Sequence, residues 1–167
     1  MEQKTNVMRI LEQKKINYKS YRYPSAKALS GEEVAKVLSQ DPGKIFKTLV
    51  TMGRSKQYYV FVIPANCALN LKKAAATVSE KSIEMIKSKE LLPLTGYVHG
   101  GCSPIGMKKT FPTVLHISAE TFESIIVSGG KIGSQVEISP DALYKLVKFQ
   151  MADVADMRQS EEEEAKQ

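Results

Sequence analysis

The chain has 167 residues, of which 43% are apolar and 25% charged, which is typical of one globular domain with its own core and excludes disordered and fibrous proteins. Its longest apolar run, Tyr58 to Ile63, is far shorter than the roughly 20 residues that a bilayer-spanning helix needs. The first ten residues carry charges and no apolar segment, so no signal peptide is expected. Two cysteines are too few for a disulfide framework, which indicates a reducing, cytoplasmic compartment.

The net charge of +6 is unevenly distributed along the chain. Residues 158–167 hold four Glu against two basic residues and are predicted to form a disordered acidic tail. Residues 1–157, predicted to be one domain, hold 22 Lys or Arg against 14 Asp or Glu, a net charge of +8. This charge suits a polyanionic partner such as RNA, although most lysines of any soluble domain are simply solvated.

Capping residues, turn residues and apolar periodicity predict the order of elements. Ser30 with Glu33 forms a capping box, and Pro140 stands in the favoured first turn of the last helix. Helices are expected over Thr5 to Lys14, Ser30 to Leu38, Leu71 to Ala76, Ser79 to Lys87, Ser88 to Leu92 and from Ser139 onward. Strands are expected over Tyr18 to Tyr23, Ile45 to Met52, Gln57 to Ile63, Val114 to Ile117, Ser124 to Ser128 and Val136 to Ile138.

The strand over Gln57 to Ile63 is apolar on both faces, so it is expected at the centre of a sheet. Residues 96–106 hold too many Gly and Pro for any regular element. Strands and helices intermix without regular β-α-β alternation. The predicted fold class is therefore mixed α/β (α+β), a single domain with a mostly antiparallel or mixed β-sheet, or a partly closed barrel, surrounded by helices.

Common catalytic patterns are absent from the sequence. Gly101 to Gly106 is followed by Met-Lys-Lys, so the P-loop motif is not met, and no dinucleotide fingerprint occurs. The cysteines and histidines could in principle form one zinc site, but their spacing fits no usual ligand pattern. A nucleophilic pair of Cys102 with a histidine is a second alternative, and a small residue packed in a tight loop is the favoured interpretation. The four residues concerned are Cys67, His99, Cys102 and His116.

Two features remain as candidates. Lys47 interrupts an apolar run and shares a strand face with Ile45 and Leu49, so it either extends to solvent at a strand edge or lines a pocket. Periodicity alone favours the edge, because buried lysines are rare. The second feature is the loop Gly96 to Gly106, whose glycines allow the backbone to approach a ligand and direct N–H groups at an oxygen. The alternative interpretation of this segment is an ordinary Gly-rich connection between two elements.

Several segments together resemble the YbaK/EbsC family of aminoacyl-tRNA deacylases, which is related to the editing domain of bacterial prolyl-tRNA synthetases. The resemblance covers about Thr5 to Ala155, and the order and spacing of its segments make it specific. It is closest to the branch that removes cysteine from mischarged tRNA(Pro), and the alanine-specific relatives match less well. The segments are Phe46 to Val50, Leu69 to Ala75, Thr95 to Tyr97, Gly100 to Lys109 and Val127 to Lys131.

The resemblance implies a trans-editing enzyme without a cofactor. A proline pocket rejects amino acids of similar or smaller volume poorly, because a methylene gives only about 1–3 kcal/mol of discrimination. A second site must therefore remove the errors. In this family the sulfur of the bound cysteine is expected to attack its own ester carbonyl, releasing tRNA and a cyclic thiolactone. The implied partners are the acceptor end of aminoacyl-tRNA and, for selectivity, prolyl-tRNA synthetase; no membrane partner is implied.

The family's functional residues are carried over by position. The essential lysine falls on Lys47, which reverses the preference for a strand edge, and the GxxxP motif falls on Gly100 to Pro104, whose amides would hold the ester carbonyl. Close relatives carry an aspartate where this sequence has Gln135, which bears on rate and specificity. The candidate catalytic groups are Lys47, Gly100 and Gly101. The candidate substrate-binding residues are Tyr23, Phe46, Thr48, Cys102, Ser103, Pro104, Ser128, Gly129 and Gln135, and no metal ligand is expected.

Two alternatives stay open beside removal of cysteine. One is an alanyl-tRNA or broad-specificity deacylase. The other is a non-catalytic tRNA-binding module that retains the fold. Lys47 and the Gly100 to Pro104 motif, both intact, favour an enzyme.

Overall fold

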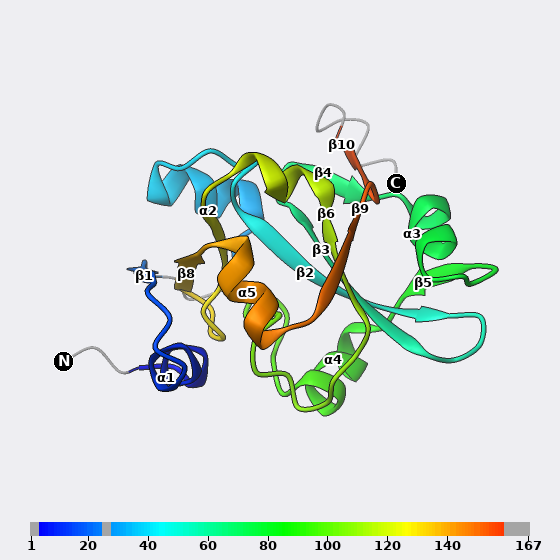
Figure 1. Cartoon of the computed structure of the whole chain (residues 1–167), viewed down its shortest axis with the longest axis horizontal. Coiled ribbons are helices and arrows are strands. Elements are labelled where there is room, and N and C mark those ends of the chain that lie inside the picture. Colours follow the sequence, from blue (N-terminus) through cyan, green and yellow to red (C-terminus); the bar gives the residue numbers. More distant parts are fainter. Residues whose placement is uncertain (1–3, 25–27, 159–167) are drawn as a thin grey trace.

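A computed structural model describes residues 4–24 and 28–158 and places their strands in three sheets (Figure 1). The predicted acidic tail beyond Arg158 lies outside the described residues. None of the described helices is both long and apolar enough to span a membrane. The mixed α/β class is confirmed, and the strands in the described ranges do not close into a barrel.

The largest sheet has five strands in the order β5-β2-β3-β6-β9. Strands β2 and β3 form the predicted hairpin, with Lys47 opposite Ile63, and β3 is central and buried along most of its length, as its two apolar faces predicted. Strands β6 and β9 continue the sheet in parallel. The strands are β2 (Phe46–Gly53), β3 (Tyr58–Pro64), β5 (Ile83–Met85), β6 (Thr113–His116) and β9 (Phe149–Ala152).

Two smaller sheets flank the first. One has the order β1-β8-β7 and joins the large sheet where Ile126 N–H donates to the carbonyl of Lys44 at 3.0 Å, just before β2. The other pairs β10 with β4. Their strands are β1 (Lys19–Arg22), β7 (Ile125–Ser128), β8 (Ser134–Ile138), β4 (Cys67–Leu69) and β10 (Ala155–Met157).

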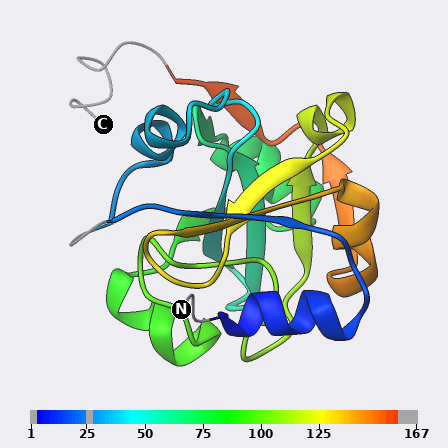
Figure 2. The same cartoon turned by 90° about the vertical axis from the view of Figure 1, so that its left-hand side faces the viewer.

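The helices are short, and the caps that the sequence predicted at Thr5, Ser30 and Ser139 are present. Thr5 accepts the N–H of Met8, and Ser30 and Glu33 form the capping box. Figure 2 shows that the chain turns back after α1 and crosses in front of the sheets toward α2. The helices are α1 (Asn6–Gln13), α2 (Gly31–Leu38), α3 (Leu71–Thr77), α4 (Ser88–Thr95) and α5 (Pro140–Leu146), with the 3-10 helix η1 at Ile117–Thr121.

The predicted helix over Ser79 to Lys87 is wrong. Ser79 has a left-handed φ of 60°, which ends the helical path, and Ile83–Met85 instead pairs with the end of β2. The Glu80 carboxylate accepts hydrogen bonds from the hydroxyls of Ser55 and Tyr59, which ties this segment to the β2–β3 hairpin. Long-range pairing therefore overrides the local helical pattern.

A buried acidic residue joins the sheet of β1 and β8 to the start of β2. The Glu137 carboxylate pairs with Lys44 Nζ at 2.7 Å and accepts hydrogen bonds from the hydroxyls of Tyr21 and Ser124. Burial alone would raise the pKa of Glu137, but the hydrogen bonds from Lys44, Ser124 and Tyr21 outweigh it and lower that pKa to about 2. We call these four residues the Glu137 cluster, and it places β2 relative to β8.

Candidate active site

A cavity of about 320 Å³ lies where the beginnings of α2, β2 and β8 meet the end of β7 and the Gly-rich loop. It combines apolar walls with a few polar groups, and among the described residues none of its lining side chains is Asp or Glu. The lining residues are Leu29, Ser30, Gly31, Val34, Ile45, Phe46, Lys47, Thr48, Leu49, Leu91, His99, Gly100, Cys102, Ser128, Gln135 and Arg158.

Lys47 is the second residue of β2 and lines this cavity, so it does not lie at a solvent-exposed strand edge. Its side chain is partly buried. Burial, and then the like charge of Arg158, lower the pKa of Lys47 to about 8. The lysine is therefore mostly protonated at pH 7 yet able to exchange its proton near pH 8.

Two further polar side chains line the cavity, Thr48 on β2 and Gln135 on β8. The Oγ1 atom of Thr48 is buried and has no hydrogen-bond partner in the described structure. Gln135 on β8 is buried, and its Nε2 donates to Tyr23 Oη at 3.3 Å. Because an amide does not take up a proton, Gln135 supplies hydrogen bonds to the cavity and no base. Tyr23 lies behind Gln135 and positions it.

The Gly-rich loop is held by its own backbone. Gly100 has a φ of 87°, and a Cβ there would lie 2.3 Å from Cβ of Ala28, so only glycine fits. The N–H of Gly101 donates to the carbonyl of Val98 at 3.0 Å. The hydroxyl of Tyr97 donates to the carbonyl of Ile105. The loop is thus pre-shaped against the cavity.

Ser103 and Pro104 are buried within the loop and do not line the cavity. Ser103 Oγ accepts the N–H of Ile105 at 3.2 Å, which accounts for a serine at this place. Gly129 also lies behind the wall, where a Cβ would come within 2.4 Å of Ser134 Oγ. Ser128 does line the cavity, and its Oγ accepts the N–H of Gly130 at 3.1 Å.

The structure separates the four residues of the possible zinc site, although His99 and Cys102 both line the cavity. Cys102 lines the cavity, but burial raises the pKa of its thiol to about 12, so the thiolate that a nucleophile requires does not form near neutral pH. His116 is buried elsewhere, where its Nδ1 accepts the N–H of Val154 at 3.2 Å. Within residues 4–24 and 28–158, no three His, Cys, Asp or Glu side chains lie close enough to hold a metal ion.

Of the residues predicted from the sequence, the cavity brings together Phe46, Lys47, Thr48, Gly100, Cys102, Ser128 and Gln135. Sequence reasoning missed the wall that α2 contributes and, above all, Arg158, which it assigned to the tail. Gly31 packs so closely that a Cβ there would meet Cβ of Ala65 at 2.4 Å. The capping box at Ser30 was a signal for the helix, but no local pattern pointed from it to the cavity.

Comparison with known proteins identifies the family. A model described as the aminoacyl-tRNA editing domain matches residues 25–146. The chain belongs to this family, and the resemblance noted from the sequence is confirmed. Over 154 residues it is 49% identical to "Putative Cys-tRNA(Pro)/Cys-tRNA(Cys) deacylase EbsC" of Enterococcus faecalis, covering 92% of this chain and 94% of that protein.

The chain is also similar to two further proteins. "Uncharacterized protein YwhH" of Bacillus subtilis is 26% identical over 112 residues, which cover 67% of this chain and 71% of that protein. A crystal structure described as a "putative trans-editing enzyme for prolyl tRNA synthetase" matches with a TM-score of 0.80 at 24% identity, covering 93% of this chain and 99% of that chain. The structural likeness establishes a shared fold.

Proposed function

We propose that this protein removes cysteine from mischarged tRNA(Pro), and also acts on Cys-tRNA(Cys), as a trans-editing deacylase of the cytoplasm. The observation that carries the proposal is the place of Lys47, a partly buried cation in a cavity lined by the Gly-rich loop. The 49% identity to EbsC, whose name states both substrates, supports the choice of substrate.

The cavity suits a small aminoacyl group. Its volume of about 320 Å³ is at the lower end of ligand cavities, which span roughly 300–1,000 Å³. Phe46 and Cys102 provide apolar contact, while Thr48 offers an unpartnered hydroxyl. A cysteine side chain, small and apolar apart from its thiol, is compatible with these walls.

In the proposed reaction the protein supplies no nucleophile. The substrate sulfur attacks its own ester carbonyl, so that a C–S bond forms and the C–O bond to the ribose breaks. The ribose oxygen leaves with a proton, and a cyclic thiolactone is released. Lys47, with its pKa lowered to about 8, matches the ordinary thiol pKa of about 8.5, so the two groups can share one proton as an ammonium–thiolate pair.

The second candidate is a deacylase with broader specificity, and Gln135 is the observation that favours it. A carboxylate at this position could accept the thiol proton, whereas the amide cannot. Of the lining residues that β2 and β8 contribute, Lys47 is then the one whose side chain can take up and release a proton. If Lys47 activates water and not the substrate thiol, water would also hydrolyse aminoacyl esters that have no thiol.

Selectivity for tRNA(Pro) is expected to come from outside the domain. A chain of this size can hold the acceptor end through phosphate contacts but has little room to read an anticodon. We therefore propose that prolyl-tRNA synthetase delivers the substrate. A pull-down of the synthetase with tRNA present and absent tests this part independently of catalysis.

The decisive experiment compares three esters, cysteinyl-, alanyl- and S-methylcysteinyl-tRNA(Pro), with wild type and Lys47→Ala. Loss of only the cysteinyl ester supports thiol-assisted cleavage, because the methylated sulfur cannot attack. Cleavage of all three supports the broad hydrolase. Cleavage of none by a folded wild-type protein overturns the assignment as a deacylase and leaves a tRNA-binding module.

A further inference from the structure

A second cation shares the cavity with Lys47. Arg158 follows the last strand, β10, and its side chain lines the cavity. Its backbone N–H donates to the carbonyl of Asn66 at 3.0 Å, and its Nη1 lies 3.6 Å from Oε1 of Glu32 on α2. The side chain is 28% exposed, so the guanidinium stands between the cavity and solvent.

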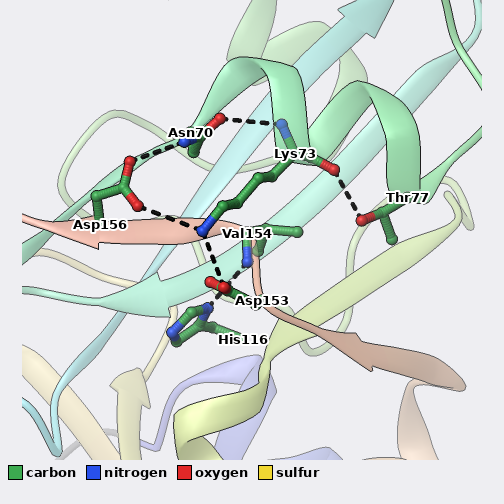
Figure 3. A network of polar contacts seen from close by, with 7 residues as sticks. All are labelled: Asn70, Lys73, Thr77, His116, Asp153, Val154 and Asp156. Atoms are coloured by element: carbon green, nitrogen blue, oxygen red, sulfur yellow. Dashed lines mark hydrogen bonds and ion pairs between the residues drawn. The ribbon is translucent and has the colours of Figure 1, made fainter.

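The strand that carries Arg158 is held firmly. Asp156 on β10 accepts a hydrogen bond from Nδ2 of Asn70 at 2.8 Å and lies 3.6 Å from Nζ of Lys73 (Figure 3). The same Nζ binds the Asp153 carboxylate at 2.9 Å. Helix α3 thus positions the β9–β10 turn, and β10 pairs with β4. The position of Arg158 is consequently a feature of the fold.

Two cations line the cavity. Lys47 and Arg158 line it together, no lining side chain of the described residues is acidic, and Glu32, which lies 3.6 Å from Arg158, stands outside the lining. A negatively charged group of a bound substrate can therefore approach both cations. The like charge of Arg158 contributes to the lowered pKa of Lys47. An aminoacyl ester brings an ammonium group and no permanent anion. The nearest permanent anion of aminoacyl-tRNA is the phosphodiester of its terminal nucleotide.

We infer that Arg158 binds the phosphodiester that links the terminal adenosine to the preceding nucleotide, while Lys47 serves the aminoacyl group. This rests on the proposed function. A guanidinium presents paired N–H donors that match two phosphate oxygens, which a lysine cannot do. Phosphate contacts fix the position of a nucleic acid without reading its sequence, so this contact places the ester carbonyl beside the Gly-rich loop.

The test separates phosphate from aminoacyl recognition by changing the substrate. Cysteinyl-tRNA(Pro) is compared with 3′-O-cysteinyladenosine, which lacks the phosphodiester, at pH 7, where Lys47 is mostly protonated. Arg158→Gln is expected to lower kcat/KM for the tRNA about tenfold, mainly through KM, and to leave the adenosine ester within twofold. The exposed hairpin residue Arg54 is the matched control, and Arg54→Gln is expected to change neither.

Binding without chemistry provides the second measurement. A CCA-ended oligonucleotide is compared with the same oligomer carrying an uncharged methylphosphonate as its last linkage. Wild type is expected to bind the methylphosphonate about tenfold more weakly, whereas Arg158→Gln binds both equally. The slope of log affinity against log salt is expected to fall by about 0.7 in the variant.

Three outcomes decide the inference. An equal loss on both esters, or a methylphosphonate effect that persists in Arg158→Gln, overturns it and makes Arg158 a partner of Lys47 alone. Partial recovery of kcat/KM by Arg158→Lys, with the tRNA and not with the adenosine ester, supports it. If wild type cleaves neither ester, the proposed function has failed. The binding measurement is separate from catalysis, and a wild type that binds both oligonucleotides equally would overturn the role of Arg158.

Discussion

Lys44 and Lys47 stand three residues apart and face two different surroundings. Lys44 belongs to the Glu137 cluster, where its Nζ lies 2.7 Å from a carboxylate that two hydroxyls also bind. Lys47 lines a cavity without acidic side chains among the described residues, and its strongest charged neighbour is another cation. The ammonium of Lys44 is neutralised by a carboxylate of the protein, whereas the ammonium of Lys47 faces a cavity in which a ligand can bind.

The pKa values express the same difference. Hydrogen bonds and the ion pair lower the pKa of Glu137 to about 2, which favours the charged, folded arrangement. Burial and Arg158 lower the pKa of Lys47 to about 8, which disfavours its charged form. A paired charge stabilises the fold, whereas an uncompensated one costs stability and is typical of functional sites.

The largest contrast is expected between Lys47→Met and Lys44→Met. Lys47→Met should lower kcat/KM for the cysteinyl ester about 10²–10³-fold, the usual effect of removing a preorganised charge-stabilising group. Its free energy of unfolding should rise by about 1 kcal/mol, because an uncompensated cation leaves the interior. Enzyme assays and urea unfolding measure both quantities on the same preparation.

Lys44→Met should show the opposite result. Removal of one partner leaves the Glu137 carboxylate buried, so we expect a loss of about 2–3 kcal/mol in the free energy of unfolding. Its activity at a temperature where it stays folded should be close to wild type, since Lys44 does not line the cavity. If both variants lost stability and kept activity, the division between the two lysines would be wrong.

The acid limb of stability should depend on Glu137. Its folded pKa of about 2 lies below the ordinary value of 4.5, so its contribution is complete above pH 4.5 and is lost as the pH falls toward 2. Glu137→Gln should cost on the order of 2 kcal/mol at pH 7 and flatten this limb. Urea unfolding at pH 7, 5 and 3 checks it. The exposed Glu84→Gln is the control, and parallel acid limbs in wild type and Glu137→Gln would contradict the assignment.

The pH profile of activity should depend on Lys47. If the ammonium of Lys47 pairs with the substrate thiolate, kcat/KM reaches a maximum between their pKa values of about 8 and about 8.5 and falls on both sides. The groups that act on Lys47 are Arg158, Cys67 and Glu32. Arg158→Gln should move the alkaline limb to higher pH because a like charge is removed. The measurement is the pH profile of kcat/KM for both proteins, corrected for spontaneous ester hydrolysis. An alkaline limb that does not move in Arg158→Gln would count against Lys47 as the titrating group.

The sequence predicts well what depends on neighbouring residues. Alternation and the intervening turn identified the β2–β3 hairpin, and the capping box of Ser30 and Glu33 placed the start of α2. It failed for β4, β5, β9 and β10, which are three or four residues long and exist because partners far along the chain pair with them. A segment of three or four residues is too short for periodicity to distinguish a strand from a helix or a loop.

The same distinction holds for the site. Periodicity placed Lys47 on a strand face but not in a cavity, because the opposite walls come from α2, the Gly-rich loop and β8. The family resemblance, and no local pattern, pointed to Lys47, Ser128 and Gln135 together. Arg158 could not be predicted, since it reaches the cavity only through the pairing of β10 with β4.

Thr48 and Thr51 repeat the contrast on a smaller scale, on the same strand. The hydroxyl of Thr51 is buried and donates to the carbonyl of Tyr59 at 3.0 Å. That of Thr48 is buried at the cavity and has no partner in the described structure. Thr51→Val should therefore cost about 1 kcal/mol of unfolding free energy and leave activity unchanged.

Thr48→Val should behave in the reverse way. An unpartnered buried hydroxyl carries a desolvation cost of about 1–3 kcal/mol, so its removal should leave the free energy of unfolding unchanged or raise it slightly. If the hydroxyl bonds to bound substrate, kcat/KM should fall about fivefold, with KM carrying most of the change. Equal activity in wild type and Thr48→Val would show that this hydroxyl faces the cavity without using it, and would leave Lys47 and Arg158 as the groups that hold the substrate.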